Sequence, residues 1–192
     1  MSAVATPLMT AEEFFDYCHR PENRDKHFEL ERGRVVEMSL PGERHGVVCG
    51  NASGLLWVYT RQRKRGQVCT NDTGLLVERD PDTVRGADVT LYNQVRRYEE
   101  LNLKYSDQPP TLLVEVLSPN DQFGKVIRRI NRFLAMGVAL VWVLDPEDRT
   151  VTVFRSGKEP VGFKADQEVT GEDVLPDLSI KVAEFFALPG QD

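Results

Sequence analysis

"TLLVEVLSPND", residues 111–121, decides how this chain folds, and a single acid within it raises the question of function. The acid, Glu115, is flanked by five aliphatic residues: Leu112, Leu113, Val114, Val116 and Leu117. Such a run is typical of a strand buried on both faces. Because side chains alternate along a strand, Glu115 shares its face with aliphatic neighbours and points into a packed layer. Burying a carboxylate costs free energy unless another group pairs with it.

A second acid stands in similar surroundings upstream. In "VRGADVTLY", residues 84–92, Asp88 lies within an apolar strand that follows a turn at Asp80-Pro81-Asp82. Two carboxylates on adjacent strands can hold a cation that prefers oxygen ligands, such as Mg²⁺. Such an ion stabilises charge on a phosphate and lowers the pKa of a bound water, which is the chemistry of phosphodiester hydrolysis. The alternative is that Glu115 only pairs with an arginine of the next helix.

Composition restricts the remaining possibilities. The 192 residues are 41% hydrophobic and 28% charged, which predicts one domain with a substantial core. The formal charge of -6 means that any contact with nucleic acid must be local. Three widely spaced cysteines indicate neither a disulfide framework nor a zinc knuckle, so we expect a reducing, cytoplasmic location. Neither a membrane span nor a signal peptide is expected, because no apolar run is long enough for a span.

The pattern of elements along the chain predicts an α/β domain around a mixed sheet. Thr10, with Glu13 three residues on, is expected to cap a short first helix, and "HFELERGRVVEM" reads as a hairpin turning at Arg32-Gly33. A helix is expected from Glu43 to about Gln62. Further elements are predicted as strands at "QVCT", "GLLVER", "ADVTLY", "ALVWVLDP" and "TVTVF", a helix entered at residues 118–121 and ending at Gly137, and a C-terminal tail folded back onto the domain.

Several stretches, in order, resemble the landmarks of one family. They are "FELERGRVVEMS", "ERHG", "NDTGLLV", "DTVRGADVTLY", "LLVEVLSPND" and "GVALVWVLDPEDRTVTVFR". The chain resembles the Uma-two family of restriction-like endonucleases, within the PD-(D/E)XK nuclease superfamily, over about residues 10–185. The resemblance implies a restriction-endonuclease-like αβββαβ core, a mixed sheet flanked by helices with an N-terminal hairpin. It also implies Asp88 as the motif aspartate and Glu115 as the motif glutamate.

The sequence departs from the superfamily at a residue that matters for catalysis. The superfamily usually has a lysine two positions beyond the glutamate, where this chain has Leu117. In the resembled family a basic residue of the following helix is thought to substitute, commonly a lysine at the position of Arg129. At 100° per residue, Arg129 lies at the margin of that helix's apolar stripe, with Lys125 one turn earlier on the same flank. An arginine stabilises a phosphate but is a poor general base.

Other polar residues are weaker candidates. Glu29 matches a glutamate that recurs in the family and is a candidate third metal ligand, or else a surface acid. His45 matches a landmark near the start of the long helix and is a candidate to contact and orient the nucleic-acid substrate or a carboxylate, or else a packing residue. Asp72 is expected to form a turn. A basic run can grip a phosphate backbone or simply be a solvated helix end: Arg61, Arg63, Lys64 and Arg65.

We therefore expect a Mg²⁺- or Mn²⁺-dependent endonuclease that hydrolyses phosphodiester bonds in DNA, a hydrolase acting on ester bonds. Asp88 and Glu115 would hold the metal, with Glu29 assisting, and Lys125 or Arg129 would stabilise the attacking water or the scissile phosphate. The alternative is a catalytically inactive nuclease-like domain that binds nucleic acid or a protein partner. A homodimer is expected from the two-fold symmetry of duplex DNA.

Overall fold

The computed structural model describes residues 7–190. Its first helix, α1 (Ala11–Cys18), begins as predicted: the Thr10 side chain accepts from the Glu13 N–H, and Glu13 caps the Thr10 N–H in return. The predicted hairpin follows as β1 (His27–Glu31) and β2 (Arg34–Met38). Both residues of its turn, Arg32 and Gly33, have a positive φ, of 48° and 74°. A short 3₁₀ turn, η1 (Pro21–Asn23), joins α1 to the hairpin.

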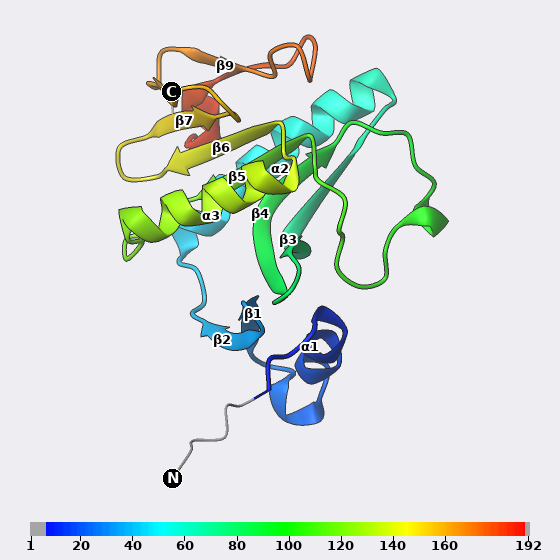
Figure 1. Cartoon of the computed structure of the whole chain (residues 1–192). Helices are drawn as coiled ribbons and strands as arrows, with labels where there is room; N and C mark the ends of the chain where they lie inside the picture. Colours follow the sequence, from blue (N-terminus) through cyan, green and yellow to red (C-terminus); the bar gives the residue numbers. More distant parts are fainter. Residues whose placement is uncertain (1–6, 191–192) are drawn as a thin grey trace.

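One mixed sheet forms the centre of the fold (Figure 1). Its strand order is β2-β1-β4-β5-β6-β7-β8, with β3 paired to β4. Among the strand pairs of this sheet within residues 7–190, β5 and β6 run parallel and are joined by the crossover helix α3, whereas the other pairs are antiparallel. The remaining strands are β3 (Gln67–Glu78), β4 (Thr83–Tyr92), β5 (Leu112–Val116), β6 (Leu140–Asp145), β7 (Thr150–Phe154) and β8 (Val161–Phe163).

Two helices cover opposite faces of this sheet. The longer, α2 (Glu43–Arg63), packs Val48, Ala52 and Leu56 into a cluster with the even-numbered residues of β5 and β6. The other, α3 (Phe123–Met136), packs Ile130 and Phe133 against the odd-numbered residues of the same strands. Because both faces of β5 and β6 are covered, their sequences read as continuous apolar runs. The predicted mixed sheet flanked by helices is therefore confirmed.

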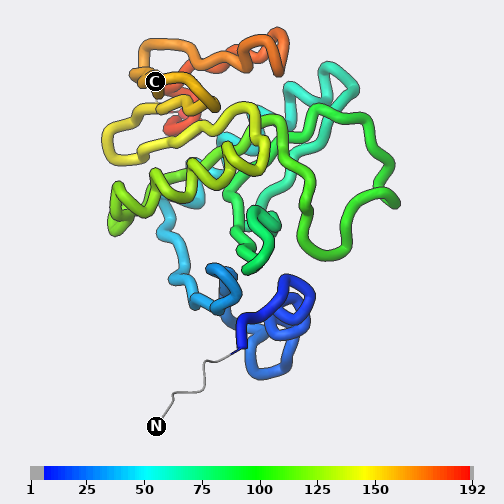
Figure 2. The backbone as a smooth tube through the Cα atoms, viewed as in Figure 1, coloured from blue at the N-terminus to red at the C-terminus, as the bar shows by residue number. Residues whose placement is uncertain are grey.

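The C-terminal tail folds back over the α2 side, as predicted. It contributes a two-stranded sheet of β9 (Glu168–Thr170) and β10 (Ser179–Lys181), and a last 3₁₀ helix, η3 (Val182–Phe185). Phe185 packs edge-on against Trp142 of the core, with 6.1 Å between ring centroids. Figure 2 shows the tail and the N-terminal hairpin at opposite ends of the molecule. Between β4 and β5, residues 93–110 form a long loop with one short turn, η2 (Tyr98–Glu100).

Two expectations need correction. Residues 67–78, predicted as two short strands, form one strand with a bulge: Thr70 pairs with Val89 and Thr73 with Ala87, leaving Asn71 and Asp72 opposite Asp88. The helix expected to enter at residues 118–121 begins only at Phe123, after Gln122. The reason is that the Asp121 carboxylate accepts from the Ser118 N–H, which closes a turn before the helix. No helix within residues 7–190 is long and apolar enough to cross a membrane.

Candidate active site

Strands β4 and β5 bring the two predicted acids to the same point of the sheet. Their backbone pairing ends at Val89 and Val114, so Asp88 and Glu115 would form the next pair. There the Asp88 side chain replaces the backbone ladder: its Oδ2 accepts from the Val116 N–H at 2.7 Å. The other oxygen of Asp88, Oδ1, takes no part in the pairing of β4 with β5 and faces His45 of α2. A carboxylate that substitutes for a ladder bond is held in a fixed orientation.

Glu115 is buried, with 5% of its surface exposed, on the face of β5 that α3 covers. Its Oε2 accepts from Arg129 Nη1 at 2.8 Å. Its Oε1 is buried and has no hydrogen-bond partner among the described residues. Burial raises the pKa of Glu115 to about 8; the Arg129 charge opposes the rise and the Asp88 charge adds to it. An unpartnered buried oxygen is costly, and a cation would satisfy it.

Arg129 and Lys125 differ in what they reach. Arg129, from the second turn of α3, points its guanidinium at Glu115, and the Glu115 charge raises the pKa of Arg129. Lys125 is exposed on the first turn and forms no ion pair within residues 7–190. Of the two basic residues predicted to act, the structure brings only Arg129 to the acids.

His45 reaches the site from the first turn of α2. Its Nε2 lies 3.4 Å from Asp88 Oδ1, and its Nδ1 lies 3.4 Å from the Sγ of Cys49, one turn further along the helix. The hydrogen bond to Asp88 raises the pKa of His45, although burial opposes the rise. The predicted substrate contact is therefore a residue that also touches the motif aspartate.

Glu29 is buried in β1, not exposed on the hairpin surface. Its Oε1 accepts from the Gly86 N–H at 3.2 Å, and its Oε2 is ion-paired with Arg85. Arg85 also pairs with Glu31, which accepts from Arg132 of α3 at 2.8 Å. Both oxygens of Glu29 already have partners, whereas Glu115 Oε1 has none among the described residues. Glu29 is therefore less available than Glu115 as a metal ligand.

Asp72, which the sequence suggested only as a turn residue, lies opposite Asp88 in the sheet. The bulge sets Asn71 and Asp72 opposite Asp88, and both have left-handed backbone, with φ of 63° and 52°. Gly86 allows this approach, because a Cβ there would lie 2.9 Å from Asp72 Cβ. Partial burial raises the pKa of Asp72, and the nearby Asp88 charge raises it further. Bulges commonly re-aim side chains beside active sites. The available signal was the Asn71-Asp72 pair, whose residue types tolerate left-handed backbone.

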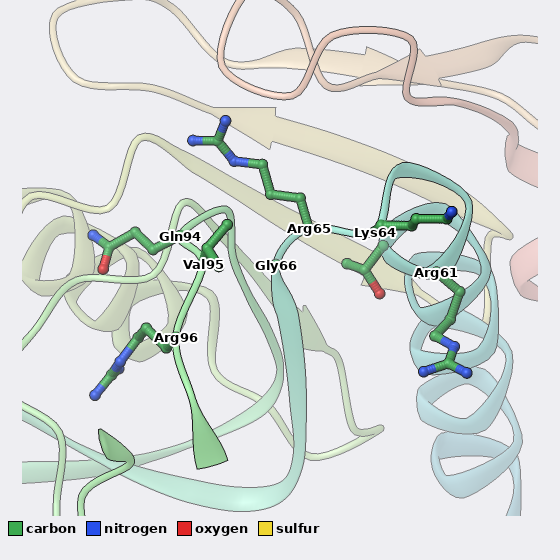
Figure 3. A pocket seen from close by; sticks show the side chains of 8 residues that line it. Arg61, Lys64, Arg65, Gly66, Gln94, Val95 and Arg96 are labelled. Carbon is green, nitrogen blue, oxygen red and sulfur yellow. The ribbon is translucent and has the colours of Figure 1, made fainter. Parts of the chain in front are cut away.

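The predicted basic contacts lie elsewhere. Lys64 follows His45 by 19 residues along α2, which places it about 28 Å away. There Arg61, Lys64 and Arg65 line an open pocket of about 440 Å³ with Arg96 from the loop after β4 (Figure 3). Arg63 is not among the lining residues, because its Nη1 lies 2.7 Å from Asp177 Oδ2. The structure therefore separates His45 from the basic run.

Comparisons with known proteins agree with this architecture. The Uma2 family model, described as "Putative restriction endonuclease", matches residues 11–183. A crystal structure of a "putative nuclease" from Anabaena variabilis superposes with a TM-score of 0.76 at 20% sequence identity, covering 93% of this chain and 97% of that one. No curated protein has a significantly similar sequence. At that identity the superposition shows the fold, which confirms the predicted restriction-endonuclease-like architecture. Since the family match spans nearly the whole chain, this protein belongs to the Uma2 family of restriction-endonuclease-like proteins.

Proposed function

We propose that this protein is a Mg²⁺-dependent endonuclease that hydrolyses phosphodiester bonds in DNA, with Asp88 and Glu115 holding the metal. The observation that carries the proposal is the buried, unpartnered Oε1 of Glu115, on the strand position opposite the fixed carboxylate of Asp88, whose charge acts on it. A pair of carboxylates suits a hard divalent ion, and restriction-endonuclease-like enzymes generally depend on one. Mn²⁺, which also prefers oxygen ligands, is expected to substitute.

Bound Mg²⁺ would supply charge stabilisation to a phosphate and acidify a water. The chain's own residues would supply position and additional charge. Arg129 stays protonated at any physiological pH, so it would bind a phosphate oxygen once Glu115 turns toward the cation. His45, hydrogen-bonded to Asp88, would hold that carboxylate in place, and Asp72 would add negative charge on the other side of Asp88.

A second candidate is a metal-binding but inactive domain. The observation in its favour is the 2.8 Å ion pair between Arg129 and Glu115, together with Leu117 where the superfamily has lysine. In that case Arg129 would neutralise Glu115 permanently, and neither it nor Lys125, which is directed to solvent, would be available to a substrate phosphate. Such a domain would bind DNA or a protein partner without cleaving it.

The test is nicking of supercoiled plasmid with millimolar Mg²⁺ or Mn²⁺, beside melting curves with and without metal. Asp88→Asn and Glu115→Gln keep shape but remove ligand charge, so we expect each to lower the nicking rate by about a thousand-fold or more. Asp148→Asn, an exposed acid on the β6–β7 turn, is the matched control and should nick like wild type. Metal should raise the melting temperature of wild type but of neither site variant.

The outcomes separate the candidates. Nicking and a melting shift that both disappear in the two variants support the enzyme. A melting shift without nicking supports the inactive metal-binding domain. A wild type that shows neither, and behaves like both variants, contradicts the metal site itself.

We also propose that two copies act together on duplex DNA, because a two-fold pair matches its two strands. Analytical ultracentrifugation at micromolar concentration, with and without a short duplex, tests this. A species that stays near the 21.8 kDa chain mass without DNA, and binds as one copy per duplex, would contradict it.

A further inference from the structure

The helix α2 carries a histidine and a cysteine one turn apart, and both face the site. Residues four apart on a helix lie on the same side, so His45 and Cys49 present their side chains together. The imidazole stands between two partners: Nδ1 lies 3.4 Å from Cys49 Sγ, and Nε2 lies 3.4 Å from Asp88 Oδ1. Taking one donor atom from each residue, all three lie within 4.8 Å of one another.

These spacings are close to those around a tetrahedral ion. Zinc bonds to sulfur, nitrogen and oxygen of ~2.0–2.3 Å place neighbouring ligand atoms roughly 3.3–3.8 Å apart. Each contact of the His45 ring falls in that range, but the two contacts use different ring nitrogens, and a single ion would take only one of them. Turning the ring would bring one nitrogen, the thiolate and the carboxylate around a single ion, with water as the fourth ligand. All three side chains are half-buried, so water could still reach that position.

The donor types select a different metal from the one proposed above. Thiolate and imidazole are ligands for zinc and other soft or borderline ions, whereas Mg²⁺ takes oxygen ligands. Burial raises the pKa of the Cys49 thiol, and the negative charges of Asp88, Asp72 and Glu115 raise it further. The same negative charges attract a divalent cation, and the cation would displace the thiol proton to solvent.

We propose that His45, Cys49 and Asp88 form a binding site for Zn²⁺, and that an ion bound there switches off the magnesium centre. Both sites draw on the same carboxylate. Asp88 Oδ2 accepts from the Val116 N–H, so Oδ1 is the more available oxygen for either ion. Zinc bound there would therefore compete with Mg²⁺ for Asp88. The proposed zinc site is inferred from the positions of its three side chains. Its inhibitory effect, in contrast, rests on the proposed nuclease function.

Cobalt is the probe, because Co²⁺ replaces Zn²⁺ in such sites and a cobalt–thiolate bond gives a near-ultraviolet charge-transfer band. Chelator-treated protein with a non-thiol reductant is titrated with Co²⁺. Wild type should develop the band and saturate at one ion per chain. Cys49→Ala should lose it, and Cys49→Ser is the second variant in case alanine perturbs folding. Cys69→Ala, another half-buried cysteine, is the matched control and should retain the band.

Glu115→Gln separates the two metal sites, because it removes a ligand of the magnesium centre and leaves the cobalt band intact. No band in wild type, or a band that survives Cys49→Ala and Cys49→Ser, overturns the proposal. Zn²⁺ should also suppress Mg²⁺-supported nicking, and the zinc concentration for half-inhibition should rise about ten-fold or more in Cys49→Ala, relative to that variant's own rate. Absence of nicking in the wild type and every variant would refute the nuclease function. The cobalt titration would still decide whether His45, Cys49 and Asp88 bind a metal.

Discussion

The two ends of α2 show two different ways of placing charge. At its N-terminal end, His45 contacts Asp88 of β4. Nearby in the sheet, Glu115 of β5 pairs with Arg129 of α3 and is buried with one oxygen unpartnered. At its C-terminal end, the basic run is contiguous in sequence, and three of its residues line an open pocket (Figure 3). The first arrangement requires the whole fold, whereas the second requires only the end of one helix.

The difference shows which end carries the stronger evidence for function. A solvated basic helix end costs little and also suits the negative end of the helix dipole, so packing and solubility explain it without a ligand. A buried carboxylate next to a second one is costly, and packing gives no reason for it. The acidic end is therefore the place where chemistry is expected, and the basic end is at most an auxiliary contact.

The largest expected effect after loss of the two acids comes from Arg129. Replacing Arg129 by Ala removes the cation nearest Glu115, and we expect the nicking rate to fall about a hundred-fold, as when one preorganised charge donor is removed. Arg129→Lys keeps the charge without the planar donor pair and should recover part of the rate. Arg128→Ala, exposed on the neighbouring position, is the control. If Arg129→Ala nicks as fast as wild type, Arg129 serves only to pair Glu115.

A smaller effect is expected at the bulge. Asp72→Asn should lower the nicking rate about ten-fold, because the charge opposite Asp88 would be removed while the backbone is kept. Asn71→Gly, which also accepts left-handed backbone, removes the neighbouring side chain and should leave the rate unchanged. Single-turnover rates at saturating metal measure both. Equal rates for Asp72→Asn and wild type would show that Asp72 forms the bulge and has no part in the chemistry.

The acidic end also predicts how stability depends on pH. Without metal, folding raises the pKa of Glu115 from 4.5 to about 8, so the folded chain binds more protons than the unfolded chain between these values. Its stabilising contribution is thus full below about pH 4.5 and is lost as pH rises through about 8. His45, whose pKa is also raised, contributes with the same sign.

Urea unfolding in chelator between about pH 6 and pH 9 measures this effect. The free energy of unfolding of wild type should fall with pH more steeply than that of Glu115→Gln, and the difference between the curves is the share of Glu115. Parallel curves would mean that Glu115 is already ionised at pH 6 in the folded protein.

The smallest effect is expected at the basic end. Changing Arg61 and Lys64 to Ser should weaken duplex binding a few-fold, and should reduce the slope of log K against log salt by about 0.9 for each phosphate that is no longer neutralised. Arg63→Ser is the matched control, because Arg63 is already paired with Asp177. Fluorescence anisotropy in the Glu115→Gln background measures binding without cleavage. An unchanged salt slope in the double variant would show that DNA does not reach the pocket.

Local signals in the sequence predicted most of the fold. The Thr10 capping box, the alternation in the hairpin and Gly137 at the end of α3 each act through neighbouring residues, and each is found where it was expected. The bulge at Asn71 and Asp72 was read as a break between strands. Its residues do have turn conformations, but β4 continues to pair on both sides of them, and that pairing is a long-range property.

The candidate site was likewise predictable where local sequence signals determine it, and not where long-range packing does. The acids in apolar strands were visible from the sequence, as was a basic residue on the flank of α3. The approach of Asp72 was not, since it depends on the register of β3 against β4. The spacing of His45 and Cys49 was visible as a helical i, i+4 pair. What the sequence lacked was the packing of α2 that aims this pair at Asp88.

The central claim is that Asp88 and Glu115 share one divalent cation. The most direct measurement is a crystal soaked in Mn²⁺ and examined by anomalous scattering, with Glu115→Gln crystals soaked in parallel. We expect one peak between Asp88 Oδ1 and Glu115 Oε1 in wild type, with Arg129 displaced from Glu115, and a weakened or absent peak in the variant. Wild-type crystals with no peak at these carboxylates, and with the Arg129–Glu115 ion pair intact at saturating Mn²⁺, would contradict it.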